Sequence, residues 1–175
     1  MIWFTADEHY GHRNIIDFCN RPYKSLEEMN ETLIANHNEV VKDEDIVIHA
    51  GDFCMWRTKR ETVQKKFVMR LNGEHHVFLK GSHDYWLRGW EAPQIYEITQ
   101  KRMHIVVCHY CMRVWARSHY NSWHLYGHSH GKLEPIGKSW DIGVDNNNYY
   151  PVSIDQVRMI MKDRPDNPNL IKRRK

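Results

Sequence analysis

Short apolar runs alternate with amphipathic stretches along this chain, and each apolar run ends in a polar or glycine-containing cluster. Apolar runs this short are typical of buried strands, whereas apolar positions at helical spacing are typical of amphipathic helices. Strands are predicted at residues 2–6, 46–50, 77–79, 124–127 and 140–144, and a hairpin at residues 96–98 and 104–108, which flank a basic turn. The alternation predicts a mixed α/β fold.

Three capping-box patterns predict where helices begin. In this pattern a Ser or Thr precedes the helix and a Glu or Gln follows three residues later, so that each side chain caps a free backbone amide. The pairs are Ser25 with Glu28, Thr58 with Glu61, and Ser153 with Gln156. Helices are therefore predicted over residues 26–41, from residue 59 to about 71, where Gly73 can end the helix, and from residue 154 onward.

Length and composition are those of an ordinary globular domain. The chain has 175 residues, of which 41% are hydrophobic and 27% charged, and this excludes collagen-like, low-complexity and broadly disordered classes. We find no internal repeat and no linker, so a single domain is predicted over residues 1–175. The net charge is +3, and residues 172–175 alone carry four positive charges. From about residue 164 we expect a polar, basic C-terminal tail.

Two observations favour a cytoplasmic protein that does not contact a membrane. No apolar run approaches the roughly 18 residues needed to cross a bilayer, and the first residues lack the basic and long apolar regions of a secretion signal. The four cysteines are too sparse for a disulfide framework, which suits a reducing compartment.

Metal-capable side chains follow five of the predicted strands. They are Asp7, Glu8, His9, Asp52, His83, Asp84, His109, His128 and His130. In open α/β folds, the loops at the carboxyl ends of neighbouring strands bring together residues that are distant in sequence. A mixed set of imidazoles and carboxylates suits two neighbouring first-row metal ions, because a carboxylate can bridge them and neutral imidazoles complete each shell.

In this order, the motifs resemble those of the calcineurin-like metallophosphoesterase family, whose pattern is D-x-H, GD, GNH[DE], H and GH-x-H. The matching segments lie between residues 7 and 130, and residues 141–155 resemble the closing strand and last helix of small bacterial and bacteriophage members. The resemblance implies two β-sheets sandwiched between helices. It also implies hydrolysis of a phosphodiester or phosphomonoester by a hydroxide that bridges two divalent ions. Manganese is favoured, with iron, zinc or nickel as alternatives.

The family pattern implies a role for each matching residue. The first ion would be bound by Asp7, His9 and His130, the second by Ser82, His109 and His128, and Asp52 would bridge both. His83 is implied to lie over the phosphate, where it stabilises developing charge or protonates the leaving oxygen. Asp84 is implied to sit behind His83 and hold its orientation.

The chain departs from the family pattern at Ser82, where the family has Asn. An amide carbonyl is the better neutral ligand for a divalent ion, so we expect Ser82 to weaken the second site. A second hypothesis is therefore a noncatalytic or weakly active module that binds phosphate or nucleic acid. A third is a structural metalloprotein, which would collapse when its metal is chelated.

Residues next to the motifs are candidates for substrate binding. His12 and Asn14 follow His9, where they could contact phosphate or cap the next helix. The arginine candidates, each in a loop that also holds tryptophan, are Arg57, Arg88, Arg113 and Arg117. Guanidinium groups pair with phosphates and indole rings stack on bases, so a nucleotide or nucleic-acid end is a suitable partner. The alternative is that the tryptophans seal the core and the arginines are solvated.

Overall fold

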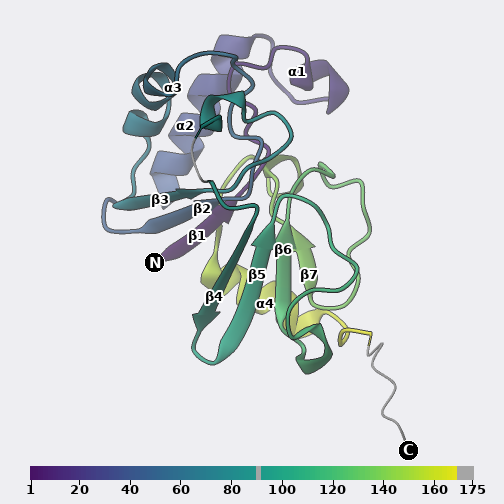
Figure 1. Cartoon of the computed structure of the whole chain (residues 1–175). Helices are drawn as coiled ribbons and strands as arrows, with labels where there is room; N and C mark the ends of the chain where they lie inside the picture. Colours follow the sequence, from purple (N-terminus) through teal and green to yellow (C-terminus); the bar gives the residue numbers. More distant parts are fainter. Residues whose placement is uncertain (90–91, 169–175) are drawn as a thin grey trace, which may run out of the picture.

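The computed structural model describes residues 1–89 and 92–168. Two four-stranded sheets pack against each other with helices outside them, as predicted (Figure 1). The strands are β1 (Ile2–Thr5), β2 (Ile46–His49), β3 (His75–Phe78), β4 (Ile95–Gln100), β5 (Met103–Cys108), β6 (Trp123–Tyr126), β7 (Ser139–Asp141) and β8 (Val152–Ser153). The helices are α1 (Ile15–Phe18), α2 (Leu26–Val40), α3 (Arg60–Lys66) and α4 (Ile154–Asp163). Short 3-10 turns are η1 (Val68–Arg70), η2 (Tyr85–Leu87), η3 (Ser118–Tyr120) and η4 (Val144–Asn146).

The first sheet has the strand order β3-β2-β1-β8. β1 pairs in parallel with β2, and β2 pairs in parallel with β3, whereas β8 is antiparallel to β1. Because the three parallel strands run in the same direction, the loops that follow them leave from one edge of the sheet.

The second sheet has the strand order β4-β5-β6-β7. β4 and β5 form the predicted antiparallel hairpin, and β5, β6 and β7 are parallel. A parallel bridge between Ala6, which follows β1, and Gly143, which follows β7, joins the carboxyl edges of the two sheets. Loops from both sheets therefore meet in one region.

Apolar side chains fill two layers. Phe4 and Ile48 lie in the layer between the sheets, where the second sheet contributes Leu125. In the other layer, Leu33 of α2 and Val63 of α3 belong to the cluster that covers the outer face of the first sheet. Successive residues of a strand point to opposite faces, so short strands of this sheet supply both layers. This packing holds the strand ends in place.

The helix starts follow two of the three predicted caps. Ser25 accepts a hydrogen bond from the Glu28 amide, and the full capping box forms between Ser153 and Gln156. The cap at Thr58 is wrong: α3 begins at Arg60 after Lys59, which makes no side-chain cap, and the helix ends at Lys66. Burial of Val63, rather than a cap, anchors this short helix. None of the helices in the described ranges combines the length and apolar character that crossing a bilayer requires.

Three details of the strand and helix pattern differ from the prediction. β3 begins at His75 rather than at residue 77, because parallel pairing with Ile46 of β2 extends it over two polar residues. β8 and α1 were not predicted, since they have two and four residues and no periodicity of their own.

Residues 164–168 pack against the body of the protein instead of starting a tail. Arg164 Nε donates to the Gly137 carbonyl at 2.6 Å, and the Asn167 amide donates to the carbonyls of Ser118 and Ser122, each at 2.9 Å. The expectation that the tail begins at about residue 164 is therefore wrong for these residues. The basic residues 172–175 lie outside the described residues.

Candidate metal centre

Five of the predicted ligands have a left-handed backbone conformation. These are Asp7, His9, Asp52, His128 and His130, with φ of 58°, 54°, 55°, 67° and 48°. This conformation is uncommon and unfavourable for residues other than glycine, and it persists where surrounding structure enforces it. Backbone hydrogen bonds of 3.0 Å from the amide of Asp7 to Gly51 and from that of His9 to Asp52 fasten the loops after β1 and β2 together.

Two glycines of the motifs allow these loops to approach closely. A Cβ atom at Gly81 would lie 2.2 Å from Oδ1 of Asp52, and one at Gly127 would lie 2.7 Å from Oδ2 of Asp7. Both distances are shorter than any contact that a real Cβ atom makes. Any larger residue at either position would displace a predicted ligand.

The first ligand group is the predicted one. The donor atoms of Asp7, His9 and His130 all lie within 4.8 Å of one another. The rings of His9 and His130 are stacked with their centroids 5.3 Å apart. One ion could therefore contact one donor atom from each of these residues.

The second ligand group consists of Asp52, His109 and His128, whose donor atoms also lie within 4.8 Å of one another. Oδ2 of Asp52 is 3.3 Å from Nε2 of His109 and 3.7 Å from Nε2 of His9, which belongs to the first group. Asp52 is thus placed between the two groups, where its carboxylate could contact an ion in either group.

Buried donor atoms without a partner show that this set fits a cation. Within the described residues, Oδ1 of Asp7, Nε2 of His9 and Nε2 of His109 are buried and accept or donate no hydrogen bond. Burial, together with the charges of Asp141 and Asp52, raises the pKa of Asp7 well above its usual range. A divalent cation would satisfy these atoms and favour the ionised carboxylate.

Asp52 behaves differently from Asp7. Burial alone would raise its pKa, but the His109 imidazole and the backbone amide of His83 lower it below its usual range. The His83 amide donates to Oδ1 of Asp52 at 2.7 Å. Asp52 is consequently ionised, with Oδ2 directed at the imidazoles and Oδ1 held by the backbone.

Hydrogen bonds on the far side of two imidazoles fix which ring nitrogen faces a metal. Nδ1 of His109 donates to the carbonyl of Ala50 at 3.0 Å, and Nδ1 of His130 donates to Oδ2 of Asp145 at 2.7 Å. In the neutral form of each ring, the lone pair is therefore on Nε2. Such partners orient a ligand and increase its basicity.

Arg21 and Asp145 contact the candidate centre, and sequence reasoning gave them no role. The Arg21 side chain is buried and makes two hydrogen bonds of 2.8 Å to the Asp145 carboxylate. It also donates to the backbone carbonyls of Asp7 and Glu8, at 2.7 Å and 3.0 Å. Arg21 therefore joins the loop after β1 to the residue that orients His130. Nothing in its local sequence signals this role.

Asp141 is a second such residue. Its Oδ2 accepts hydrogen bonds from the Ser129 hydroxyl at 2.7 Å and from the Gly131 amide at 2.8 Å. Its Oδ1 accepts from the Gly143 amide at 2.8 Å. These bonds shape the loop that carries His128 and His130. The resemblance marked the segment from residue 141, but not this role.

Ser82 lies beside the second ligand group. Its hydroxyl donates to Oδ2 of Asp52 at 3.0 Å, and the residue is exposed. That it ligates a metal stays a prediction.

His83 and His12 lie next to the first ligand group. The ring centroids of His83 and His9 are 5.6 Å apart, and those of His12 and His83 are 6.1 Å apart. Nδ1 of His12 lies 3.2 Å from Nδ1 of His9. Asn14 occupies the N-cap position of α1, but its side chain makes no cap. His12 is therefore near the candidate centre, and the capping alternative for Asn14 is not supported.

Asp84 does not orient His83, contrary to the expectation. Its carboxylate accepts hydrogen bonds from the backbone amides of Asp52, Phe53, Cys54 and Gly81 and from the Trp86 indole, at 2.7 to 3.3 Å. Nδ1 of His83 is buried with no partner among the described residues. The short turn after Gly81 directs the Asp84 carboxylate to the loop of Asp52, so it fastens the two loops to each other.

Two of the four candidate arginines lie together, and the other two lie elsewhere. Arg57 and Arg88 line one hollow beside Tyr85. Arg113 is exposed and has no side-chain hydrogen bond or ion pair with any described residue. Arg117 lines a different hollow together with Met103, at the start of β5, whereas His109 follows the end of that strand. Its role in substrate binding stays a prediction. The left-handed backbone at Arg117 turns the chain there (φ 58°).

The tryptophans mostly favour the core interpretation. Trp86 and Trp115 are buried, with 3% and 7% of their surface exposed, so neither can stack on a base. Trp56 is partly buried and lies against Gly11. Trp90 lies outside the described residues.

Comparisons with known proteins agree with this geometry. A family model described as calcineurin-like phosphoesterase matches residues 1–172. An uncharacterised protein of Methanocaldococcus jannaschii is 33% identical over 171 residues, which cover 93% of each chain. A solved structure of a protein of unknown function from Aquifex aeolicus has a TM-score of 0.67 and 20% identity, covering 91% of this chain and 98% of that one.

Fold and ligand groups together define a metal-dependent class of protein. This chain belongs to the calcineurin-like phosphoesterase family. Family membership favours hydrolase activity, and the two groups of donor atoms supply candidate metal ligands.

Proposed function

We propose that this protein hydrolyses a phosphodiester or phosphomonoester, with nucleotide-like esters as one candidate substrate class, and that it uses two divalent ions, preferably Mn²⁺. The position of Asp52 between the two ligand groups carries this proposal. Bound ions would supply an acidified water as nucleophile and neutralise charge on the phosphate. The four free cysteines are consistent with a reducing cytoplasm.

The protein's own residues would do three things. Asp7, His9, Asp52, His109, His128 and His130 would hold the ions, with Ser82 beside the second. His83 would hold a proton and donate it to the leaving oxygen, since its ring lies next to His9 without a partner on Nδ1. His12, Arg57 and Arg88 would bind the phosphate ester.

A noncatalytic phosphate-binding module is the second candidate. It is favoured by Ser82, because a hydroxyl that donates to Asp52 competes with an ion for the same oxygen. In that case phosphate esters would bind to the metal-loaded protein without being cleaved.

The test is hydrolysis of bis(p-nitrophenyl) phosphate and p-nitrophenyl phosphate by protein stripped with a chelator and then reloaded with Mn²⁺. We expect metal-dependent turnover that falls about 100-fold or more in Asp52→Asn. His75→Gln removes an exposed histidine and serves as the control. Binding of both esters without hydrolysis would favour the noncatalytic module, and neither binding nor hydrolysis would refute both functions.

A further inference from the structure

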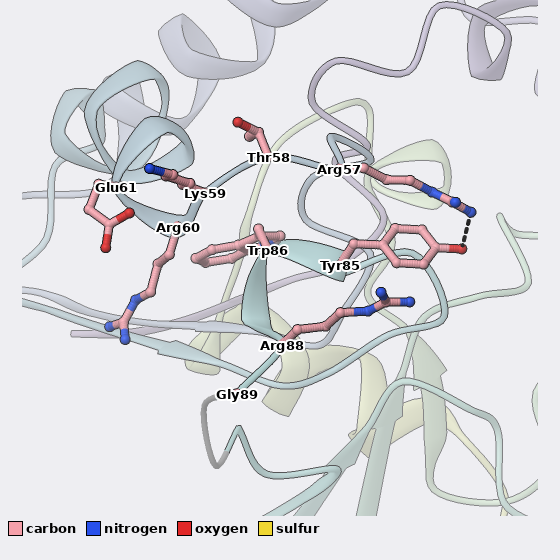
Figure 2. A pocket seen from close by; sticks show the side chains of 9 residues that line it. All are labelled: Arg57, Thr58, Lys59, Arg60, Glu61, Tyr85, Trp86, Arg88 and Gly89. Carbon is pink, nitrogen blue, oxygen red and sulfur yellow. Dashed lines mark hydrogen bonds between the residues drawn. The ribbon is translucent and has the colours of Figure 1, made fainter.

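A basic hollow of about 900 Å³ is lined by residues that follow the candidate ligands Asp52 and Ser82 closely in sequence. Four of its lining residues are basic and one is acidic: Arg57, Lys59, Arg60 and Arg88 against Glu61. Tyr85 lies between the side chains of Arg57 and Arg88 (Figure 2). Such an excess of positive charge attracts anions.

The two arginines are held in place by one aromatic ring. The guanidinium carbon of Arg57 is 4.3 Å from the centroid of the Tyr85 ring, and that of Arg88 is 4.9 Å away. Nη2 of Arg57 also donates to the Tyr85 hydroxyl at 3.1 Å. A guanidinium has five N–H donors, so most donors of both groups remain available. Cation–π contact fixes their position without using those donors.

No carboxylate of the described residues neutralises either arginine. In the described ranges, no Asp or Glu forms an ion pair with Arg57 or Arg88, whereas other arginines of this chain are paired: Arg13 with Asp17, Arg21 with Asp145, Arg70 with Glu31 and Arg158 with Asp155. Two like charges placed around one ring repel each other, and a bound anion would offset this repulsion. The arrangement therefore favours an external anionic partner.

The hollow and the metal centre are built from the same two loops. The loop of Asp52 continues to Arg57, and the loop of Ser82 and His83 continues to Tyr85. The Asp84 carboxylate fastens these loops through hydrogen bonds to the backbone of Asp52 and its neighbours. Burial of Trp86 anchors the following turn. The backbone that lines the hollow is thus connected to the loops that carry the candidate ligands.

We infer that Arg57 and Arg88, positioned by Tyr85, bind a second phosphate of the substrate, distinct from the phosphate at the metal centre. The inference rests on the proposed function and narrows it to esters that carry two phosphates. Guanidinium groups pair with phosphate oxygens through two parallel hydrogen bonds, which gives both affinity and geometry. The second phosphate could belong to a nucleotide or to a phosphorylated sugar, since the recognised chemistry is the same.

Binding to the Mn²⁺-loaded full chain tests this inference. Calorimetry would compare thymidine 3′,5′-bisphosphate with thymidine 5′-monophosphate, and fructose 1,6-bisphosphate with fructose 6-phosphate, while ³¹P NMR verifies that the ligands stay intact. We expect at least one bisphosphate to bind about 10-fold or more tightly than its monophosphate. Arg57→Gln and Arg88→Gln should remove that preference. Tyr85→Leu, which changes no charge, should reduce it.

Lys65→Gln is the matched control, because Lys65 is an exposed cation of α3 that does not line the hollow. The Lys65→Gln variant should prefer bisphosphates to the same extent as the original protein. The ligand pair that shows the preference, thymidine phosphates or fructose phosphates, identifies the source of the second phosphate. Equal Kd values within both pairs, or a preference that survives in Arg57→Gln and Arg88→Gln, would overturn the inference. The inference would also be overturned if Lys65→Gln abolished the preference for bisphosphates as fully as the two arginine variants do.

Hydrolysis of bis(p-nitrophenyl) phosphate, measured in parallel, separates the two proposals. A preference for bisphosphates without any hydrolysis would refute the proposed catalysis and support the second-phosphate site. Hydrolysis without a preference for bisphosphates would support the proposed catalysis and refute the second-phosphate site.

Discussion

Asp145 accepts a hydrogen bond of 2.7 Å from Nδ1 of His130, and the same carboxylate is held by Arg21 from a loop 124 residues away in sequence. Burial alone would raise the pKa of Asp145, but His130 and Arg21 lower it. The ionised carboxylate thereby sets the orientation of His130 towards Asp7 and His9. The candidate centre therefore depends on residues that do not themselves face a metal.

Replacing Asp145 by Asn should weaken metal binding at the first ligand group. The amide keeps the size of the side chain but loses its charge, so it holds His130 and Arg21 less firmly. Loss of such a partner typically costs 10- to 100-fold in metal affinity, and we expect a weakening of about this size for Mn²⁺ in calorimetric titration. Asp155→Asn, which removes an exposed carboxylate of α4, is the control. Unchanged affinity in Asp145→Asn would contradict the role assigned to this residue.

His83→Ala should lower turnover without removing metal. Its ring lies beside His9, and it belongs to neither ligand group. If His83 protonates the leaving oxygen, turnover should fall by about 10²- to 10⁴-fold, while Mn²⁺ content by mass spectrometry stays the same. A substrate with a better leaving group should recover part of the loss, because it needs less protonation. Loss of bound metal would instead mean that His83 is a ligand.

Ser82→Asn should raise occupancy of the second ligand group. The Asn carbonyl reaches one heavy atom farther than the Ser hydroxyl and is a better neutral ligand for a divalent ion. It would also remove the hydroxyl that donates to Asp52. We expect more Mn²⁺ bound per chain at limiting metal, and higher turnover of bis(p-nitrophenyl) phosphate. Two equally tight sites and equal turnover in both proteins would show that Ser is a competent substitute.

The free energy of unfolding should decrease at acidic pH, and part of this decrease should come from protonation of His124. Nε2 of His124 accepts a hydrogen bond from the Met112 amide, and Nδ1 donates to the Val106 carbonyl, so the ring must be neutral. Burial lowers its pKa from 6.5 to about 4. Between these values the unfolded chain binds the proton more readily, so the free energy of unfolding decreases as the pH falls from about 6.5 to about 4.

Urea denaturation of chelator-treated protein at several pH values would measure this effect. One fully shifted group contributes up to about 1.4 kcal/mol per pH unit, so His124→Gln should show a visibly shallower pH dependence. His75→Gln, which removes an exposed histidine, should keep the original slope. Equal slopes in all three proteins would show that His124 does not titrate as its contacts require.

Sequence patterns predicted the strand ends, and the resemblance to the family motifs predicted which side chains would gather there as metal ligands. Each apolar run marks a strand locally, and parallel strands place the residues that follow them at one edge, so Asp7, Asp52 and His109 were expected to converge. The family order of the motifs then divided the ligands between two ions. In the structure Asp7, His9 and His130 form one ligand group and Asp52, His109 and His128 another, whereas Ser82 belongs to neither, and Cys19, His130 and Asp145 form a further group.

Tertiary structure alone decided what the remaining charged residues do. Asp84 was expected to serve its neighbour His83, yet its carboxylate reaches the loop of Asp52, about 30 residues away. Arg117 was grouped with the site because it follows His109, yet the chain turns back to the start of β5 before reaching it. The hydrogen bond from Arg21 to Asp145 joins a loop of the first sheet to a loop of the second sheet. Local patterns report burial and periodicity, but the partner of a charged side chain is set by which distant loops the packed sheets bring together.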